Sequence, residues 1–173
     1  MALQLGEDRI PREGNDPRIV VLGIGNTLLT DEGLGPQAVE RLRHQASTHL
    51  ELLDGGTLSY SLVPVVEEAD ALIVIDAARL GLPPGTVRRF TGVRLDRLLR
   101  SRLVTAHEVG LKELFDMARL SGHLPRLRAL IAVEPDVIDW GMALSPKVDA
   151  AMERVILLVQ ATAHRWQSRI KPR

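Results

Sequence analysis

Acidic residues stand where several apolar runs of this chain end, and one histidine stands where a helical pattern begins. Glu32 lies in GIGNTLLTDEGLG after the first run, Asp54 ends LELLD, Asp76 ends LIVID, and His107 lies in VTAHEVGL. In an open parallel sheet, functional groups collect at the carboxyl ends of the strands. Each acid alone is also explained as a cap for the loop that follows it. Together, three acids on three loops at one sheet edge favour a shared site.

Glu32, Asp76 and His107 make a set of two carboxylates and one imidazole that suits Zn, Ni, Co or Mn better than a soft metal. A helix start disfavours the imidazolium form, so His107 tends toward the neutral, ligating form. An aspartate that closes an apolar strand is costly unless it is paired, hydrogen-bonded or ligating. Two plainer interpretations stay open: Asp31 and Glu32 cap a helix after Thr30, and His107 is an ordinary surface histidine.

The glycine-rich stretch after the first apolar run is also typical of a phosphate-binding turn. A dinucleotide fingerprint needs a third glycine, and Leu28 stands at that position. No Lys-Ser or Lys-Thr pair follows a glycine loop, and Asp31 and Glu32 would repel a pyrophosphate. The chain also lacks the HExxH pattern of zinc proteases and the GxSxG serine elbow. These observations favour a cation over a phosphate.

Composition excludes several classes of protein. The 173 residues contain no cysteine, which excludes disulfides, thiolate metal sites and a cysteine nucleophile. The formal net charge is zero and aromatic residues make up 3%, so we expect no nucleic-acid partner. No apolar run is long enough for membrane insertion, and the N-terminus does not resemble a signal peptide. We therefore expect a soluble, cytoplasmic protein.

Alternating apolar runs and amphipathic stretches predict a single-domain, three-layer α/β fold with helices on both faces of a mostly parallel sheet. The short connection before the fourth run predicts that this strand is antiparallel and at an edge. We interpret residues 1–16 as a mobile extension, 17–168 as the domain and 169–173 as a basic tail. The predicted strands are 18–23, 50–54, 71–76, 86–90 and 128–133, and the predicted helices are 35–46, 59–68, 105–121 and 146–167.

Five motifs occur in the order and spacing of a known family. GIGNTLLTDEGLG, LDGGT, LIVIDAA, HEVGL and EP…WGMALSP resemble the hydrogenase maturation proteases, over roughly residues 18–165. These endopeptidases remove a C-terminal extension from the precursor of the nickel-containing hydrogenase large subunit after nickel insertion. By motif, the family's metal-binding residues correspond to Glu32, Asp76 and His107. Asp54 matches a further acidic position near the cleft, and Gly25 with Asn26 matches the turn that shapes the first loop.

The resemblance implies a metal-dependent endopeptidase whose partner is the hydrogenase precursor. Nickel would be supplied by the substrate, and zinc or cadmium would substitute in the free protein. Glu32, Asp76 and His107 would engage the nickel, with hydrolysis by carbonyl polarisation or a metal-activated water. Asp54 or a neighbouring carboxylate would act as general base. We expect a monomer.

The sequence leaves two other functions open. The chain could be a nickel-dependent chaperone that binds the precursor without cutting it. It could also be a nucleotide-binding enzyme that uses GIGN as a degenerate fingerprint, although Leu28 and the acidic pair argue against this.

Overall fold

The fold is built on a five-stranded sheet of order β2-β1-β3-β5-β4. The computed structural model describes residues 17–45, 49–57, 60–101 and 106–170, except the side chains of 106–109. The expected extension over 1–16 and residues 171–173 of the expected tail lie outside these ranges. The strands are β1 (Ile19–Ile24), β2 (Leu50–Gly56), β3 (Ala71–Ala77), β4 (Val87–Thr91) and β5 (Leu127–Val133).

Strand directions confirm the predicted mixed sheet. The pairings of β1 with β2, of β1 with β3 and of β3 with β5 are all parallel. β4 pairs antiparallel with β5 at the edge, as its short connection to β3 predicts. The carboxyl ends of four strands therefore meet at one edge of the sheet, which we call the carboxyl edge, and their starts define the amino edge.

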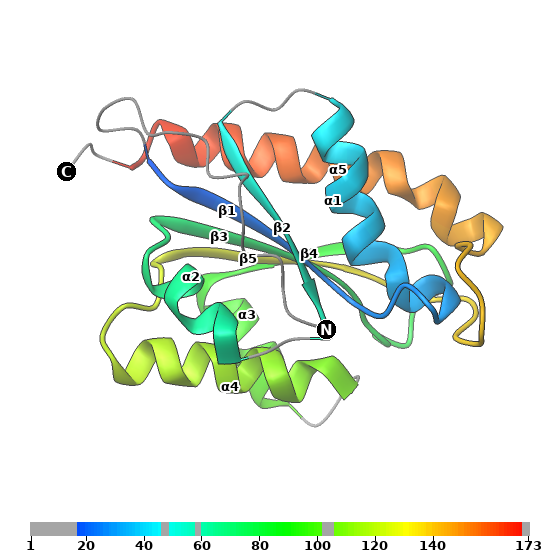
Figure 1. Cartoon of the computed structure of the whole chain (residues 1–173), viewed down its shortest axis with the longest axis horizontal. Coiled ribbons are helices and arrows are strands. Elements are labelled where there is room, and N and C mark those ends of the chain that lie inside the picture. Colours follow the sequence, from blue (N-terminus) through cyan, green and yellow to red (C-terminus); the bar gives the residue numbers. More distant parts are fainter. Residues whose placement is uncertain (1–16, 46–48, 58–59, 102–105, 171–173) are drawn as a thin grey trace.

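Helices cover both faces of the sheet, as Figure 1 shows. One face is covered by α1 and α5, and the other by α2, α3 and α4. Short 3-10 turns, η1 and η2, precede α1 and α2. Their bounds are η1 (Thr30–Gly33), α1 (Leu34–His44), η2 (Tyr60–Leu62), α2 (Val63–Glu67), α3 (Gly92–Arg100), α4 (Ala106–Leu120) and α5 (Pro146–Gln167). Within the described ranges, none of these helices is long and apolar enough to cross a bilayer.

Side-chain alternation along β3 assigns each residue to a face. Ile73 and Ile75 pack in the core beneath α1 and α5, whereas Leu72 and Val74 pack beneath α2, α3 and α4. Every residue of β3 is buried, as expected for a central parallel strand. By the same alternation Asp76 belongs to the face of α2, α3 and α4.

The direction of α4 follows from its two ends. Gly122, with φ of +80°, terminates the helix, and His123 N donates to Ala118 O at 2.8 Å. Ser121 Oγ donates to Glu67 Oε1, just before β3 begins, so the last turn of α4 lies at the amino edge. The first turn of α4 therefore lies at the carboxyl edge (Figure 1).

Among the differences from the sequence prediction, those at α3 and β2 are the largest. The prediction missed α3, although Leu95 and Leu99 lie one turn apart and are both buried. β2 extends two residues past the predicted end at Asp54, with a register shift opposite Gly23 and Ile24. Pro64 lies in the first turn of α2, which begins at Val63 directly after η2 ends at Leu62, so helical residues lie on both sides of it.

Candidate active site at the carboxyl edge

The glycines of GIGNTLLTDEGLG allow backbone to approach backbone. A Cβ on Gly35 would clash with Ile24 O and lie 2.6 Å from Ile75 O, so the first turn of α1 touches the ends of β1 and β3. Gly25 has φ of +140°, and a Cβ there would overlap Glu32 O. These contacts fold the loop tightly over the strand ends. They account for these glycines without a phosphate.

The acidic pair divides into two different roles. Asp31 is fully buried, and its carboxylate accepts four hydrogen bonds from a segment more than a hundred residues away. The donors are Asp136 N at 2.8 Å, Val137 N at 2.8 Å, Ser145 N at 2.6 Å and Ser145 Oγ at 2.8 Å. Glu32 is only partly buried. Asp31 therefore holds the structure, and Glu32 stays the predicted metal-binding member of the pair.

Thr30 completes the link between the first loop and residues 136–145. Thr30 has φ of +38°, a rare conformation for a β-branched residue, and such strain clusters at functional sites. Thr30 Oγ1 donates to Val137 O at 2.7 Å and accepts from Asp139 N at 3.1 Å. Thr30 N donates to Gly141 O at 2.6 Å. The strained turn is thus fixed from both sides directly before the Asp31-Glu32 pair.

Asp76 lies at the carboxyl end of β3, opposite Ala132 of β5, and only 1% of its surface is exposed. Its neighbours along the strand are apolar and equally buried. Ionising a carboxylate in such a place is costly unless charge or donors compensate it. The turn η1, which carries Glu32, packs against β3. The structure thus brings the backbones of Glu32 and Asp76 to the same edge.

His107 lies in the first turn of α4, and its side chain is outside the described part of the structure. The predicted capping box, Thr105 with Glu108, lies outside it as well. The backbone of α4 nevertheless places this turn at the carboxyl edge, on the face to which Asp76 belongs. Helix α4 packs there through Leu111 and Phe115. The meeting of the His107 and Asp76 side chains stays a prediction, because the structure describes only the backbone of His107.

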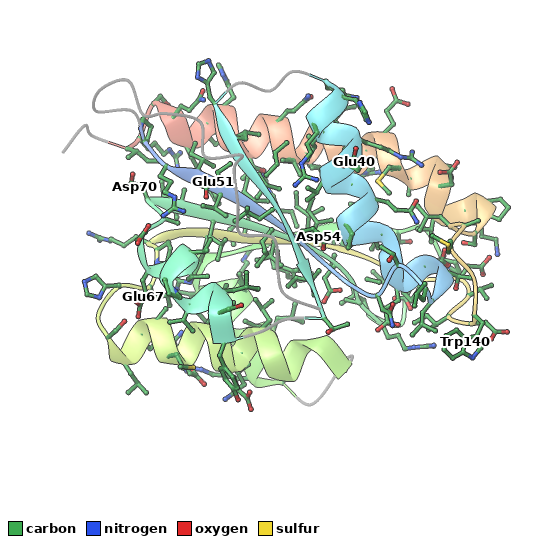
Figure 2. The ribbon with its side chains drawn as sticks, in the orientation of Figure 1. Glu40, Glu51, Asp54, Glu67, Asp70 and Trp140 are labelled. Atoms are coloured by element: carbon green, nitrogen blue, oxygen red, sulfur yellow. The ribbon has the colours of Figure 1, made fainter. Side chains whose placement is uncertain are left out.

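Asp54 belongs to the other face of the sheet from Asp76. Along β2, Leu50 and Leu52 pack on the face of α1 and α5, and Gly55 approaches Leu22 on the opposite face. Alternation therefore gives Asp54 the α1 and α5 face. Its carboxylate is exposed and Oδ1 accepts from Gly56 N at 2.8 Å, which is a local turn bond. Figure 2 shows Asp54 on the sheet surface near α1.

Glu134 and Ser145 are structural residues that the sequence reasoning did not single out. Glu134 is 7% exposed, and its Oε2 accepts from Leu80 N at 2.6 Å and Leu82 N at 3.1 Å, which fixes the loop after β3. Ser145 directly precedes α5, and its hydroxyl donates to Asp31 and makes no capping bond to the helix. Both residues lie in EP…WGMALSP. The sequence feature that could have revealed them is a polar residue at each end of this largely apolar loop.

The donor set matches a divalent metal in chemistry. Among the side chains that the structure describes, no group of three His, Cys, Asp or Glu could hold a metal ion. Two of the three predicted ligands, Glu32 and Asp76, lie within that part of the chain, and His107 lies outside it. Two carboxylates and a neutral imidazole would leave open coordination positions for a substrate group.

Comparison with known proteins identifies relatives over most of the chain. A family model described as hydrogenase maturation protease matches residues 36–162. The hydrogenase expression/formation protein HupD of Thiocapsa roseopersicina is 43% identical over 137 residues, which are 78% of this chain and 62% of that protein. This chain thus spans about three fifths of that relative's length. The hydrogenase 2 maturation protease of Escherichia coli K12 is 33% identical over 83% of this chain and 89% of that protein.

Solved structures agree with this assignment. The hydrogenase maturating endopeptidase HybD from Escherichia coli superposes with a TM-score of 0.79 at 32% identity, covering 86% of this chain and 93% of that one. The [NiFe] hydrogenase maturation protease HybD from Thermococcus kodakarensis gives 0.73 at 26% identity, covering 83% and 97%. The family match, the sequence relatives and the shared mixed sheet show that this chain belongs to the hydrogenase maturation protease family.

Proposed function

We propose that this protein is the endopeptidase that removes the C-terminal extension of a nickel hydrogenase large-subunit precursor, and that it recognises nickel already inserted in that substrate. Family membership over most of the chain is the observation that carries the proposal. The reaction would take place in the cytoplasm, with the enzyme as a monomer.

In this proposal Glu32, Asp76 and His107 engage the substrate's nickel and so position the cleavage site. The burial of Asp76 at a strand end, the packing of η1 against β3 and the place of α4's first turn support this role. Zinc or cadmium would occupy the same donors in the free protein. The metal would supply polarisation of the scissile carbonyl or activation of water.

A carboxylate at the carboxyl edge would take the proton of the attacking water. Asp54 is poorly placed for this, because it lies on the opposite face from Asp76 and its Oδ1 is used in a turn bond. Glu32 is partly exposed at the correct edge, directly after the fixed Thr30 and Asp31. We therefore assign the general base to Glu32 in place of Asp54, through the carboxylate oxygen that does not engage the metal.

The test is the mass of the large subunit after incubation with the purified protein. The precursor is supplied nickel-loaded in one sample and nickel-free in the other. Loss of the extension only from the nickel-loaded precursor supports the proposal. Binding without any loss of mass would select the nickel-dependent chaperone. If His107→Ala and Glu32→Gln both cleave at the full rate, the assignment of the site is wrong.

A further inference from the structure

Five large apolar side chains are exposed together beside the candidate site. We call them the apolar tip. Trp140 is 80% exposed and Met142 is 69% exposed. The members are Leu28, Val137, Ile138, Trp140 and Met142.

The tip is contiguous although its members come from two segments far apart in the sequence. Leu29 and Gly141 form a parallel bridge, and Gly141 N donates to Leu28 O at 2.9 Å. Leu28 therefore lies next to the backbone of Trp140 and Met142. Figure 2 shows Trp140 projecting from the molecule beside the loop between β1 and α1.

The backbone beneath the tip is fixed. The buried Asp31 carboxylate and Thr30 Oγ1 hold Asp136, Val137 and Asp139, as described above. Gln37 Nε2 also donates to Met142 O at 3.0 Å. A fixed backbone lowers the entropy cost of binding. The free energy gained by burying Trp140 is therefore not offset by ordering of the loop.

The composition of the tip is that of a binding hot spot. Tryptophan and methionine are enriched in protein interfaces, and a central aromatic surrounded by polar groups is the usual arrangement. Asp136, which pairs with Lys147 at 3.2 Å, and the exposed Asp139 form such a polar surround. Elsewhere on the described surface, Leu120 and Leu157 are exposed on separate helices. They give matched apolar positions outside the tip.

The size and place of the tip select its partner. Five partly exposed side chains offer roughly a few hundred Å², whereas a stable dimer needs about 800 Å² per partner. The tip is too small to hold a second copy alone. It is joined through Thr30 and Asp31 to the loop that carries Glu32, so a substrate bound at Glu32 continues onto it.

We propose that the apolar tip docks the hydrogenase precursor by burying Trp140 against an apolar surface next to the cleavage site. This inference rests on the proposed function, because that function names the substrate. It assigns to the tip the binding of the protein part of the substrate, separately from the groups that engage its metal.

The first test separates binding from chemistry. Trp140→Ala should raise KM for the nickel-loaded precursor about 30-fold with kcat nearly unchanged, and Trp140→Phe should restore most of the loss. Leu120→Ala is the matched control, because Leu120 is 89% exposed at the far end of α4. It should leave both constants unchanged. Equal KM values for the Trp140→Ala and Leu120→Ala variants would overturn the proposal.

The second test reads the docking directly and does not need cleavage. The chain has two tryptophans, and Trp166 is 5% exposed whereas Trp140 is largely exposed. In a Glu32→Gln background, adding precursor should shift the emission to shorter wavelength as Trp140 leaves water. The shift should vanish in the Trp140→Phe variant. An unchanged emission spectrum at saturating precursor would overturn the proposal.

The two tests also separate this proposal from the proposed function. A precursor that stays uncut by the native protein but shifts Trp140 emission would reject the protease and support the docking surface. A precursor that is cut with no effect of Trp140→Ala would support the protease and reject the docking surface. A precursor that is neither cut nor bound would reject both.

Discussion

Replacing Asp31 by asparagine should destabilise the protein far more than its position beside an exposed loop suggests. The carboxylate accepts three bonds from backbone N–H groups and one from Ser145 Oγ. Oδ2 accepts three of them and Oδ1 accepts one, from Ser145 N. An amide can present only one oxygen, so its NH₂ group must face at least one buried N–H donor.

The magnitude follows from that count. A hydrogen bond to a charged acceptor contributes about 1.5–3 kcal/mol, and a buried donor left unsatisfied costs about 1–3 kcal/mol. In the Asp31→Asn variant the remaining bonds have an uncharged acceptor, and the bond from Ser145 N is lost. Together these changes should lower the free energy of unfolding by about 3 kcal/mol. For a chain of this length, that corresponds to roughly 6–12 °C in Tm.

Urea titration and thermal melting of the two proteins measure this effect. Asp139→Asn is the control, because Asp139 lies on the same loop, is exposed, and its Oδ1 accepts one local bond from Trp140 N at 2.7 Å. It should change Tm by no more than about 2 °C. Equal Tm values for Asp31→Asn and Asp139→Asn would refute the structural role of Asp31.

Three further outcomes follow from other contacts. Arg128 donates to both oxygens of Asp96 at 3.0 and 2.6 Å and holds the pKa of that carboxyl below its usual value. Arg128→Met should cost about 2 kcal/mol at pH 7 by urea titration. A carboxyl whose pKa is lowered in the folded state stabilises that state fully only above the pKa of the unfolded chain. The difference in unfolding free energy between the native protein and Arg128→Met should therefore shrink below about pH 4. Gly35→Ala should lower Tm by roughly 6–12 °C, since its Cβ meets the backbone of Ile24 and Ile75. Zinc should raise the Tm of the native protein and leave that of Glu32→Gln unchanged, whereas equal shifts would remove Glu32 from the ligand set.

The sheet was predictable because its strands carry strong local signals. β3 and β5 are mostly apolar and contain β-branched residues, and the antiparallel edge follows from the short link before β4. Helix α3 was missed because much of its surface is charged, and only Leu95 and Leu99 are buried. Leu95 and Leu99 become buried only when α3 packs against α4 and β5.

The sequence singled out the acidic pair of the first loop, but it did not show that its two members have different roles. Asp31 and Glu32 are adjacent in the sequence. Only the contact with residues 136–145 shows that the Asp31 carboxylate is occupied by structural hydrogen bonds. Asp54 is a second example. The sequence predicted that it ends a strand, but not to which face of the sheet it belongs. Alternation along β2 becomes readable once Gly55 and Leu22 are seen in contact.

The central claim is that the chemistry lies at the carboxyl edge on the side of Asp76, with Asp54 outside it. The most direct measurement is the single-turnover rate of precursor cleavage by Asp76→Asn and Asp54→Asn, with Tm used to verify folding. We predict a loss of at least about a hundredfold for Asp76→Asn and a change within about threefold for Asp54→Asn. A full rate for Asp76→Asn, or a loss confined to Asp54→Asn, would contradict it.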